Sequence, residues 1–138
     1  MMKIDKAVLY TDGASRGNPG PAAIGAVIKD RQGQVLARIS RRIGRTTNNQ
    51  AEYRAVIAGL EEAARLGVAR VELRADSELV VKQINGLYRV KNPALRSLHQ
   101  RVQELRASFQ SFTAAHIPRH RNAEADRLCN VALDAAVD

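Results

Sequence analysis

Four acids stand where they could share one site, namely Asp12, Glu52, Asp76 and Asp126. Asp12 directly follows the apolar run 7–11, which we expect to be a buried strand, and Asp76 directly follows a second expected strand, 71–75. Glu52 and Asp126 fall in the first turns of predicted helices, which can overhang the same edge of a sheet. Packing gives no reason to gather like charges, whereas a divalent cation does. Because the donors are carboxylates without a Cys/His cluster, the set predicts a site for Mg²⁺ or Mn²⁺ rather than zinc.

Each acid also has an explanation that needs no metal. Glu52 could complete a capping box with Asn49, and Asp76 could cap the helix that follows it. Asp126 could complement the dipole of its helix, and Asp12 could form an Asx-turn. It is the occurrence of all four together that favours the metal site.

The elements that must position these acids follow from hydrophobic periodicity and from Gly and Pro. Strands are expected at about 4–11, 22–29, 34–43, 71–75 and 112–117, and helices at 49–66, 79–84, 92–109 and from 122 onward. The final helix should place Ala125, Cys129, Ala132 and Ala136 on its inner face.

This order of elements predicts an α/β fold. The turn at 30–33 joins antiparallel strands, while strand-helix-strand connections imply parallel pairing with right-handed crossovers. The result is a mixed sheet with helices on both faces. In such sheets the site lies beyond the carboxyl ends of strands, where Asp12 and Asp76 are expected to be neighbours.

Length and charge limit the function. The 138 residues are expected to form one domain, 1–138, and 22 Lys+Arg against 14 Asp+Glu leave a net charge of +8. Such a balance favours nucleic acid as partner, although basic proteins can also owe their charge to solubility alone. The absence of Trp argues against stacking on single-stranded bases. The lone Cys129, the polar start of the sequence and the lack of a long apolar run predict a reducing cytoplasm and no membrane contact.

Five motifs carry a resemblance to a known family. They are Tyr10-Thr11-Asp12-Gly13, Gly17-Asn18-Pro19-Gly20, Thr47-Asn48-Asn49 with Glu52, Asp76-Ser77, and Asn122-Ala123-Glu124-Ala125-Asp126. Their order and spacing resemble type 1 ribonuclease H over nearly the whole chain. The resemblance implies the ribonuclease H-like fold, a five-stranded mixed sheet in the order 3-2-1-4-5 with strand 2 antiparallel. It also implies an endonuclease that hydrolyses the RNA strand of RNA–DNA hybrids, leaving 5′-phosphate and 3′-hydroxyl ends.

The same resemblance assigns roles to the four acids. Asp12 would be shared by two Mg²⁺ ions, for which Mn²⁺ could substitute. Asp126 would join it on the ion that activates the attacking water. Glu52 and Asp76 would hold the ion that stabilises the leaving 3′ oxygen. Paired ions about 3.5–4 Å apart suit phosphodiester hydrolysis, because both apical oxygens need charge compensation.

The resemblance also implies how the substrate is held. Backbone groups of Gly13, Ala14 and Ser15, together with the side chains of Asn48 and Asn49, would contact RNA 2′-hydroxyls and minor-groove edges. Asn18 and Thr47 would bind a DNA phosphate. Read without the rest of the pattern, these segments are only a turn and a helix cap.

Two departures from the family pattern bear on function. The segment 86–92 joins two helices directly, where many members carry a basic insertion rich in lysine and tryptophan. The chain therefore resembles the compact branch, for which duplex RNA is a second candidate substrate, and we expect it to be a monomer. Glu78 stands where a hydrogen-bonding Gln is common, and an acid there repels phosphate.

The histidine that assists proton movement or product release in this family has two candidates here. His120 matches by its place after the last strand, and His116 matches by its distance from Asp126. We favour His120, because His116 is expected to end the strand as a hydrogen-bonded structural residue. His99 is expected to be exposed on the long helix.

Two other classes of function remain. A catalytically silent duplex-binding module would have little reason to keep four acids. A resolvase or 3′-exonuclease on the same fold would share the clustered carboxylates, but the segment Thr47-Asn48-Asn49 argues against it.

Overall fold

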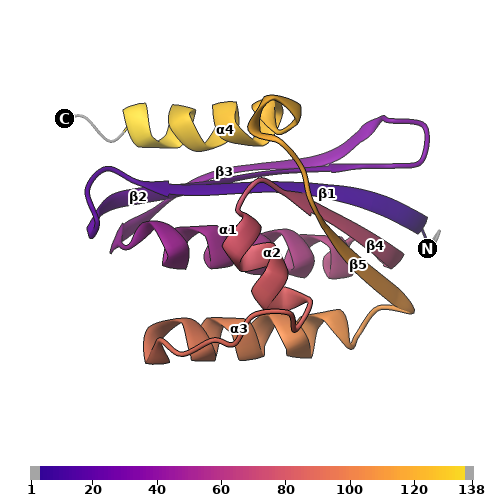
Figure 1. Ribbon diagram of the computed structural model, residues 1–138. Coiled ribbons are helices and arrows are strands. Elements are labelled where there is room, and N and C mark those ends of the chain that lie inside the picture. The colour runs from indigo at the N-terminus through magenta and orange to yellow at the C-terminus, as the bar shows by residue number, and fades with distance from the viewer. Residues whose placement is uncertain (1–3, 136–138) are drawn as a thin grey trace.

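The computed structural model describes residues 4–135 and contains a five-stranded mixed sheet (Figure 1). Its strands are β1 (Ile4–Ser15), β2 (Gly20–Lys29), β3 (Val35–Thr46), β4 (Val68–Ala75) and β5 (Ser111–His116). The spatial order is β3-β2-β1-β4-β5. β2 is antiparallel to both β1 and β3, whereas β4 is parallel to β1 and β5. The predicted fold class, strand order and orientation of the second strand are confirmed.

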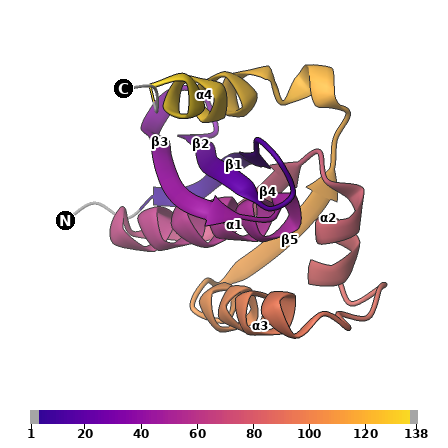
Figure 2. The same cartoon turned by 90° about the vertical axis from the view of Figure 1, so that its left-hand side faces the viewer.

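Helices cover both faces of this sheet. They are α1 (Asn48–Arg65), α2 (Glu78–Ile84), α3 (Pro93–Arg106) and α4 (Ala123–Asp134), with a short 3-10 helix, η1 (Arg119–Arg121), before α4. α4 lies on one face, and α1, α2 and α3 lie on the other (Figures 1 and 2). Between residues 4 and 135 no helix combines the length and the apolar character needed to cross a membrane.

The main core fills the space between the sheet, α1 and α3. Its centre consists of large side chains with no exposed surface, among them Leu9, Tyr53, Leu60, Leu73 and Val102. Burying each such side chain contributes roughly 1.5–3 kcal/mol. This core fixes α1 against β1, and α1 is the helix that carries Glu52.

A smaller apolar cluster lies under α4. Cys129 and Ala132 face inward from that helix, as predicted, and pack with Ala23 of β2. Ala136, also predicted for this face, lies outside the described residues. α4 approaches the sheet closely at Gly25, where a Cβ would lie 2.6 Å from the Cys129 backbone nitrogen. This close approach sets the height of α4 above the sheet.

β1 is longer than predicted. It continues beyond Thr11 to Ser15, because β2 supplies an antiparallel partner for each added residue. β4, in contrast, ends at Ala75, which pairs with Thr11. We expected Asp12 to follow the end of its strand. It lies instead within β1, one residue beyond the last residue that pairs with β4.

The helix ends are mostly as the sequence predicted. Gly67 and Gly86 follow α1 and α2 with positive φ angles of 80° and 77°. Asn92 caps α3, its Oδ1 accepting from the Ala94 amide at 2.8 Å. α3 ends at Arg106, so Phe109 packs in the core from just beyond the helix. The helix was predicted to reach Phe109 because Phe109 continues its apolar pattern, but Phe109 is buried from the segment after the helix.

Candidate active site

Three carboxylates meet where β1 and β4 part. Asp12, Glu52 and Asp76 each offer an oxygen, and these oxygens lie within 4.8 Å of one another. Asp12 and Glu52 are each only 8% exposed. Asp126 lines the same cavity of about 330 Å³ from the first turn of α4. The structure thus brings the four predicted acids to one cleft from β1, α1, the junction of β4 with α2, and α4.

Glu52 is held in place by the backbone of β1. Its Oε1 accepts a hydrogen bond from the Gly13 amide at 2.5 Å. The first turn of α1 can come this close only because Gly13 has no side chain. A Cβ there would lie 2.6 Å from the Glu52 nitrogen and closer still to the Ala51 carbonyl.

The capping-box explanation for Glu52 is therefore wrong. The N-cap of α1 is Thr47, whose hydroxyl accepts from the Gln50 amide at 3.2 Å, and Asn49 lies inside the helix. With the cap supplied by Thr47, the Glu52 carboxylate is available to the cleft.

Asp76 is likewise not a helix cap. Ser77 caps α2, its hydroxyl accepting from the Val80 amide at 3.3 Å. Asp76 sits between the last residue of β4 and this cap, so its carboxylate faces the cleft without a role in α2. The capping alternative for Asp76 is wrong.

Asn122 has the residue type and the position of a helix cap, but its side chain does not cap α4. Its Nδ2 instead donates to the Thr11 carbonyl at 2.8 Å. Its backbone carbonyl accepts from the Asp126 amide at 3.1 Å. The Asp126 carboxylate also lies 3.7 Å from the exposed Arg119 guanidinium.

The acids perturb one another strongly. Burial, then the charge of Asp76 and the proximity of Asp126, raise the pKa of Asp12 from 3.8 to about 7. Burial and the Asp12 charge raise the pKa of Glu52 well above its ordinary value, although the Gly13 amide opposes this. Such shifts mark carboxylates that are costly to ionise together without a compensating cation.

The donor set suits a hard divalent cation. The clustered groups are carboxylates alone within residues 4–135. Cys129 lies close enough for burial and the negative charges of Asp12 and Glu52 to raise the pKa of its thiol to about 12. A thiol that stays protonated is a poor ligand, so the site offers oxygen donors, as Mg²⁺ and Mn²⁺ prefer.

The predicted substrate-contacting residues lie beside the acids, at the end of β1, in the turn that follows it and at the start of α1. The Asn18 Oδ1 accepts from the Asn48 amide at 3.0 Å, and the Asn48 Oδ1 accepts from the Ser15 amide at 3.3 Å. Gly13, Ala14 and Asn48 line the acidic cavity.

A second cavity, of about 390 Å³, adjoins these residues. It is lined by Asn18, Thr47, Asn48, Asn49, Asn92 and Leu95. Because Asn48 lines both cavities, the two lie side by side. Asn49, predicted to contact RNA, lines only the second cavity, and Ser15 lines neither.

Ser77, which the sequence marked only as part of the motif Asp76-Ser77, also lines the acidic cavity, as do two residues that the sequence did not single out, Arg119 and Asn130. Asn130 follows Asp126 by four residues on α4, so helical spacing could have placed it on the same face. Arg119 had no comparable signal, because its position depends on the turn of η1.

The histidines differ from expectation in two of three cases. His120 lies exposed in η1 and is not among the residues that line the acidic cavity. His116 ends β5, as predicted, but it is exposed and has no side-chain hydrogen bond within residues 4–135, so its structural interpretation is wrong. His99 is half-buried. Its Nε2 lies 3.0 Å from the Gln83 carbonyl and its ring packs edge-on against Tyr53, so the expectation of an exposed residue is also wrong.

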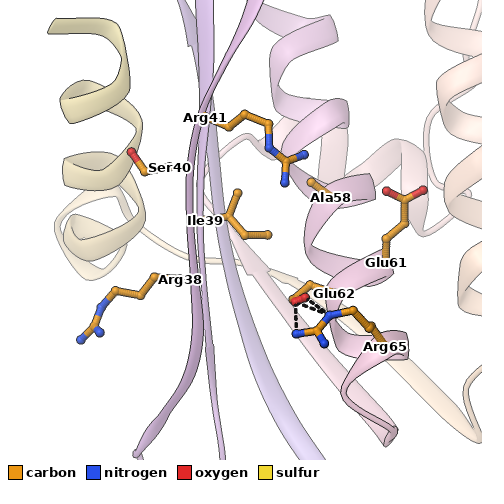
Figure 3. A pocket seen from close by; sticks show the side chains of 8 residues that line it. All are labelled: Arg38, Ile39, Ser40, Arg41, Ala58, Glu61, Glu62 and Arg65. Carbon is orange, nitrogen blue, oxygen red and sulfur yellow. Dashed lines mark hydrogen bonds and ion pairs between the residues drawn. The ribbon is translucent and has the colours of Figure 1, made fainter. Parts of the chain in front are cut away.

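Another hollow lies between β3 and α1, away from the acids (Figure 3). Its volume is about 410 Å³, and it contains the ion pair of Glu62 with Arg65, at 2.6 Å. None of the predicted site residues lines it. The acidic cleft, and not this larger hollow, is therefore the candidate active site.

Comparison with known proteins identifies the family. A family model described as reverse transcriptase-like matches residues 10–132. Ribonuclease HI of Halobacterium salinarum is 50% identical over 127 residues, covering 92% of this chain and 64% of that protein. The chain belongs to the ribonuclease H family. A crystal structure of RNase H1 from the same archaeon superposes with a TM-score of 0.93 at 49% identity, covering 95% of this chain and 99% of that one.

Two further ribonuclease H relatives are close. The bifunctional protein Rv2228c of Mycobacterium tuberculosis is 48% identical over 132 residues, which cover 95% of this chain and 36% of that protein. The structure of LC11-RNase H1, isolated from compost, in complex with an RNA/DNA hybrid has a TM-score of 0.91 at 44% identity, covering 96% of this chain and 99% of that one. The chain thus spans less than two thirds of the length of the Halobacterium and Mycobacterium relatives.

Proposed function

We propose that this chain is a metal-dependent endoribonuclease that hydrolyses the RNA strand of RNA–DNA hybrids, leaving 5′-phosphate and 3′-hydroxyl ends. The observation that carries the proposal is the convergence of Asp12, Glu52 and Asp76, whose oxygens lie within 4.8 Å of one another. Membership of the ribonuclease H family and the hybrid bound to LC11-RNase H1 support it.

We assign the metal-binding role to the four acids. Asp12 and Asp126 would hold one Mg²⁺, and Asp12, Glu52 and Asp76 would hold a second. Mn²⁺ has the same preference for oxygen ligands. Bound there, the cations would lower the pKa of a water molecule and compensate charge on the attacking and leaving oxygens.

Backbone contacts within the chain would orient these carboxylates. Gly13 donates its amide to Glu52 and thereby holds that carboxylate against β1. The raised pKa of Asp12 means that cation binding competes with a proton near neutral pH. Activity should therefore increase with pH through this range.

We assign recognition of the hybrid to the end of β1 and the start of α1, beside the acids. Backbone groups of Gly13, Ala14 and Ser15, with Asn48 and Asn49, would meet the RNA strand. A 2′-hydroxyl both donates and accepts hydrogen bonds, so polar groups placed here would distinguish RNA from DNA.

The neighbouring cavity would bind a phosphate of the DNA strand through Asn18 and Thr47. Asn18 already accepts from the Asn48 amide, so the two sites are mechanically linked. Contact with DNA on one side and with RNA on the other suits a hybrid duplex.

His120 would assist proton movement or product release from outside the cleft. Its place on exposed η1, directly after Arg119 of the cavity wall, supports an auxiliary role of this kind. The carboxylates would carry most of the catalysis.

The net charge of +8 suits a polyanionic duplex, and we infer that the chain acts as a monomer in the cytoplasm. Duplex RNA is a second candidate substrate, because the compact form lacks the basic insertion that grips hybrids in many relatives.

The test is cleavage of end-labelled RNA–DNA hybrid, duplex RNA and duplex DNA by the purified protein, with Mg²⁺, Mn²⁺ or EDTA. We expect internal cuts in the RNA strand of the hybrid with either metal and none with EDTA. Binding of the hybrid without cleavage would instead indicate a silent binding module. Cleavage of duplex DNA would indicate a different nuclease on the same fold.

A further inference from the structure

Asn122 occupies an unusual place beside the active site. Every other residue from 117 to 124 is exposed or half-exposed, whereas Asn122 is only 1% exposed. Burying an amide side chain costs free energy unless the amide forms hydrogen bonds, so we expect Asn122 to have a hydrogen-bond partner. Helix capping does not supply one, because the side chain makes no cap hydrogen bond to α4.

The side chain of Asn122 instead contacts β1, at the end of its pairing with β4. Pairing of these strands ends at Thr11 and Ala75, and Asn122 Nδ2 donates to the Thr11 carbonyl at 2.8 Å. Thr11 immediately precedes Asp12. The side-chain amide of Asn122 is therefore hydrogen-bonded to β1 one residue before Asp12.

The backbone of Asn122 acts on the other side of the cleft. Its carbonyl accepts from the Asp126 amide at 3.1 Å in the first turn of α4. Two hydrogen bonds thus run from the Thr11 carbonyl through Asn122 to the Asp126 amide. They connect the immediate neighbour of Asp12 to Asp126 across 111 residues of sequence between Thr11 and Asn122.

Ion pairs also hold the start of α4, where Glu124 contacts Lys29 at 3.1 Å and Arg38 at 3.4 Å, but these pairs do not reach the neighbour of Asp12. Arg119 lies 3.7 Å from Asp126, but its side chain is 82% exposed, and exposed ion pairs constrain little. The Oδ1 of Asn122 is buried without a hydrogen-bond partner within residues 4–135. An apolar residue would avoid that orphan acceptor, so packing alone does not account for an amide here.

We infer that Asn122 is a positioning residue that holds Asp126 against Asp12, so that the two can share a divalent cation. The inference rests on the proposed function for the role of Asp126 as a ligand. Groups that orient ligands in this way typically change metal affinity or activity by about 10- to 100-fold when removed.

The test compares Asn122→Ala and Asn122→Asp with the wild-type protein. Neither variant can donate to the Thr11 carbonyl, and Asn122→Asp keeps the size of the side chain. Mg²⁺ affinity is measured by calorimetry without substrate, and kcat and KM are measured on the hybrid. We expect the Mg²⁺ affinity to fall at least about 10-fold and kcat to fall about 10- to 100-fold. KM should be nearly unchanged, because the substitution leaves the predicted substrate-contacting residues in place.

A matched control separates positioning from loss of stability. Val102→Ala removes buried volume from α3, on the face of the sheet opposite α4. It should lower the melting temperature without changing Mg²⁺ affinity. If Asn122→Ala loses stability but binds Mg²⁺ as the wild type does, Asn122 is structural only and the inference fails. An equal loss of affinity in Val102→Ala would overturn it as well.

The wild-type protein offers a test that needs no variant to fold. The Asn122 side-chain amide protons should exchange slowly with solvent, and their resonances should shift when Mg²⁺ is added. Fast exchange without a shift would contradict the tether. A wild-type protein that binds Mg²⁺ but leaves hybrids intact would defeat the proposed function while leaving this inference standing.

Discussion

The amide of Gly13 donates to the carboxylate of Glu52 at 2.5 Å, so the strand that carries Asp12 also orients the carboxylate opposite it. The contact joins positions 39 residues apart and is buried. It requires a residue without a side chain in β1, since the first turn of α1 lies directly over Gly13.

This contact predicts that Gly13→Ala is strongly destabilising. The added Cβ would meet backbone atoms of Ala51 and Glu52, which cannot rotate away, and overpacking of this kind costs about 1–3 kcal/mol or more. Urea denaturation measures the loss. Gly33→Ala is the control, because it adds only backbone strain, with nothing within 4 Å of the new Cβ. Equal losses in the two variants would show that the close approach of α1 is unimportant.

Asp12 should make the metal-free protein less stable as pH rises. Its pKa is raised in the folded state, from 3.8 to about 7. The folded state therefore binds the proton more tightly than the unfolded state, and this contribution is complete below pH 4. It is lost as pH rises from about 4 to 7.

Asp12→Asn should remove this loss. The variant should gain stability relative to the wild type as pH rises from 4 to 7, by up to about 4 kcal/mol at about 1.4 kcal/mol per pKa unit. Thermal unfolding in EDTA at pH 4 and pH 8 measures the difference. If the wild type were as stable as Asp12→Asn at pH 8, the carboxylates would not be in conflict.

His120 should contribute moderately to turnover. Because proton-transfer groups typically contribute 10²–10⁴-fold and the carboxylate site is expected to dominate here, His120→Ala should lower kcat by about 10- to 100-fold. His116→Ala is the control. Its exposed side chain should leave stability within about 0.5 kcal/mol of the wild type. Reduced turnover in His116→Ala alone would show that the other histidine has the role.

The compact form should bind its substrate weakly and with strong dependence on salt. Each duplex phosphate contacted contributes roughly 0.9 to the slope of log affinity against log salt concentration. A basic insertion between Gly86 and Lys91 should lower KM and steepen this slope. It should change kcat little, because uniform binding does not selectively stabilise the transition state. Kinetics at several salt concentrations decide the matter, and an unchanged KM in a well-folded variant would show that the body already supplies these contacts.

The order of elements could be predicted because each left a local pattern. An apolar run marked β1 and alternating apolar residues marked β4, and the expected parallel pairing placed Asp12 and Asp76 on adjacent strands. The length of β1 could not be predicted, because residues beyond Thr11 are strand only through their partners in β2.

The contacts that orient the site were hidden for a related reason. Asn122 has the local signature of a helix cap, and only the tertiary structure reveals that its amide reaches Thr11. The same holds for Glu52, whose spacing from Asn49 imitates a capping box while its carboxylate turns to Gly13. Local sequence identifies side chains able to accept or donate, but the partner depends on the fold.

Asp12 is proposed to organise a metal-dependent site that cuts RNA paired to DNA. The most direct measurement is cleavage of an end-labelled RNA–DNA hybrid by the wild type and by Asp12→Asn, each in Mg²⁺ and in EDTA, with folding verified by circular dichroism. The wild type should cut the RNA strand internally in Mg²⁺ and leave 5′-phosphate ends, while EDTA or the substitution abolishes cleavage. Substantial Mg²⁺-dependent cleavage by Asp12→Asn would show that Asp12 does not organise the site. Cleavage by the wild type in EDTA would show that the site does not depend on a metal.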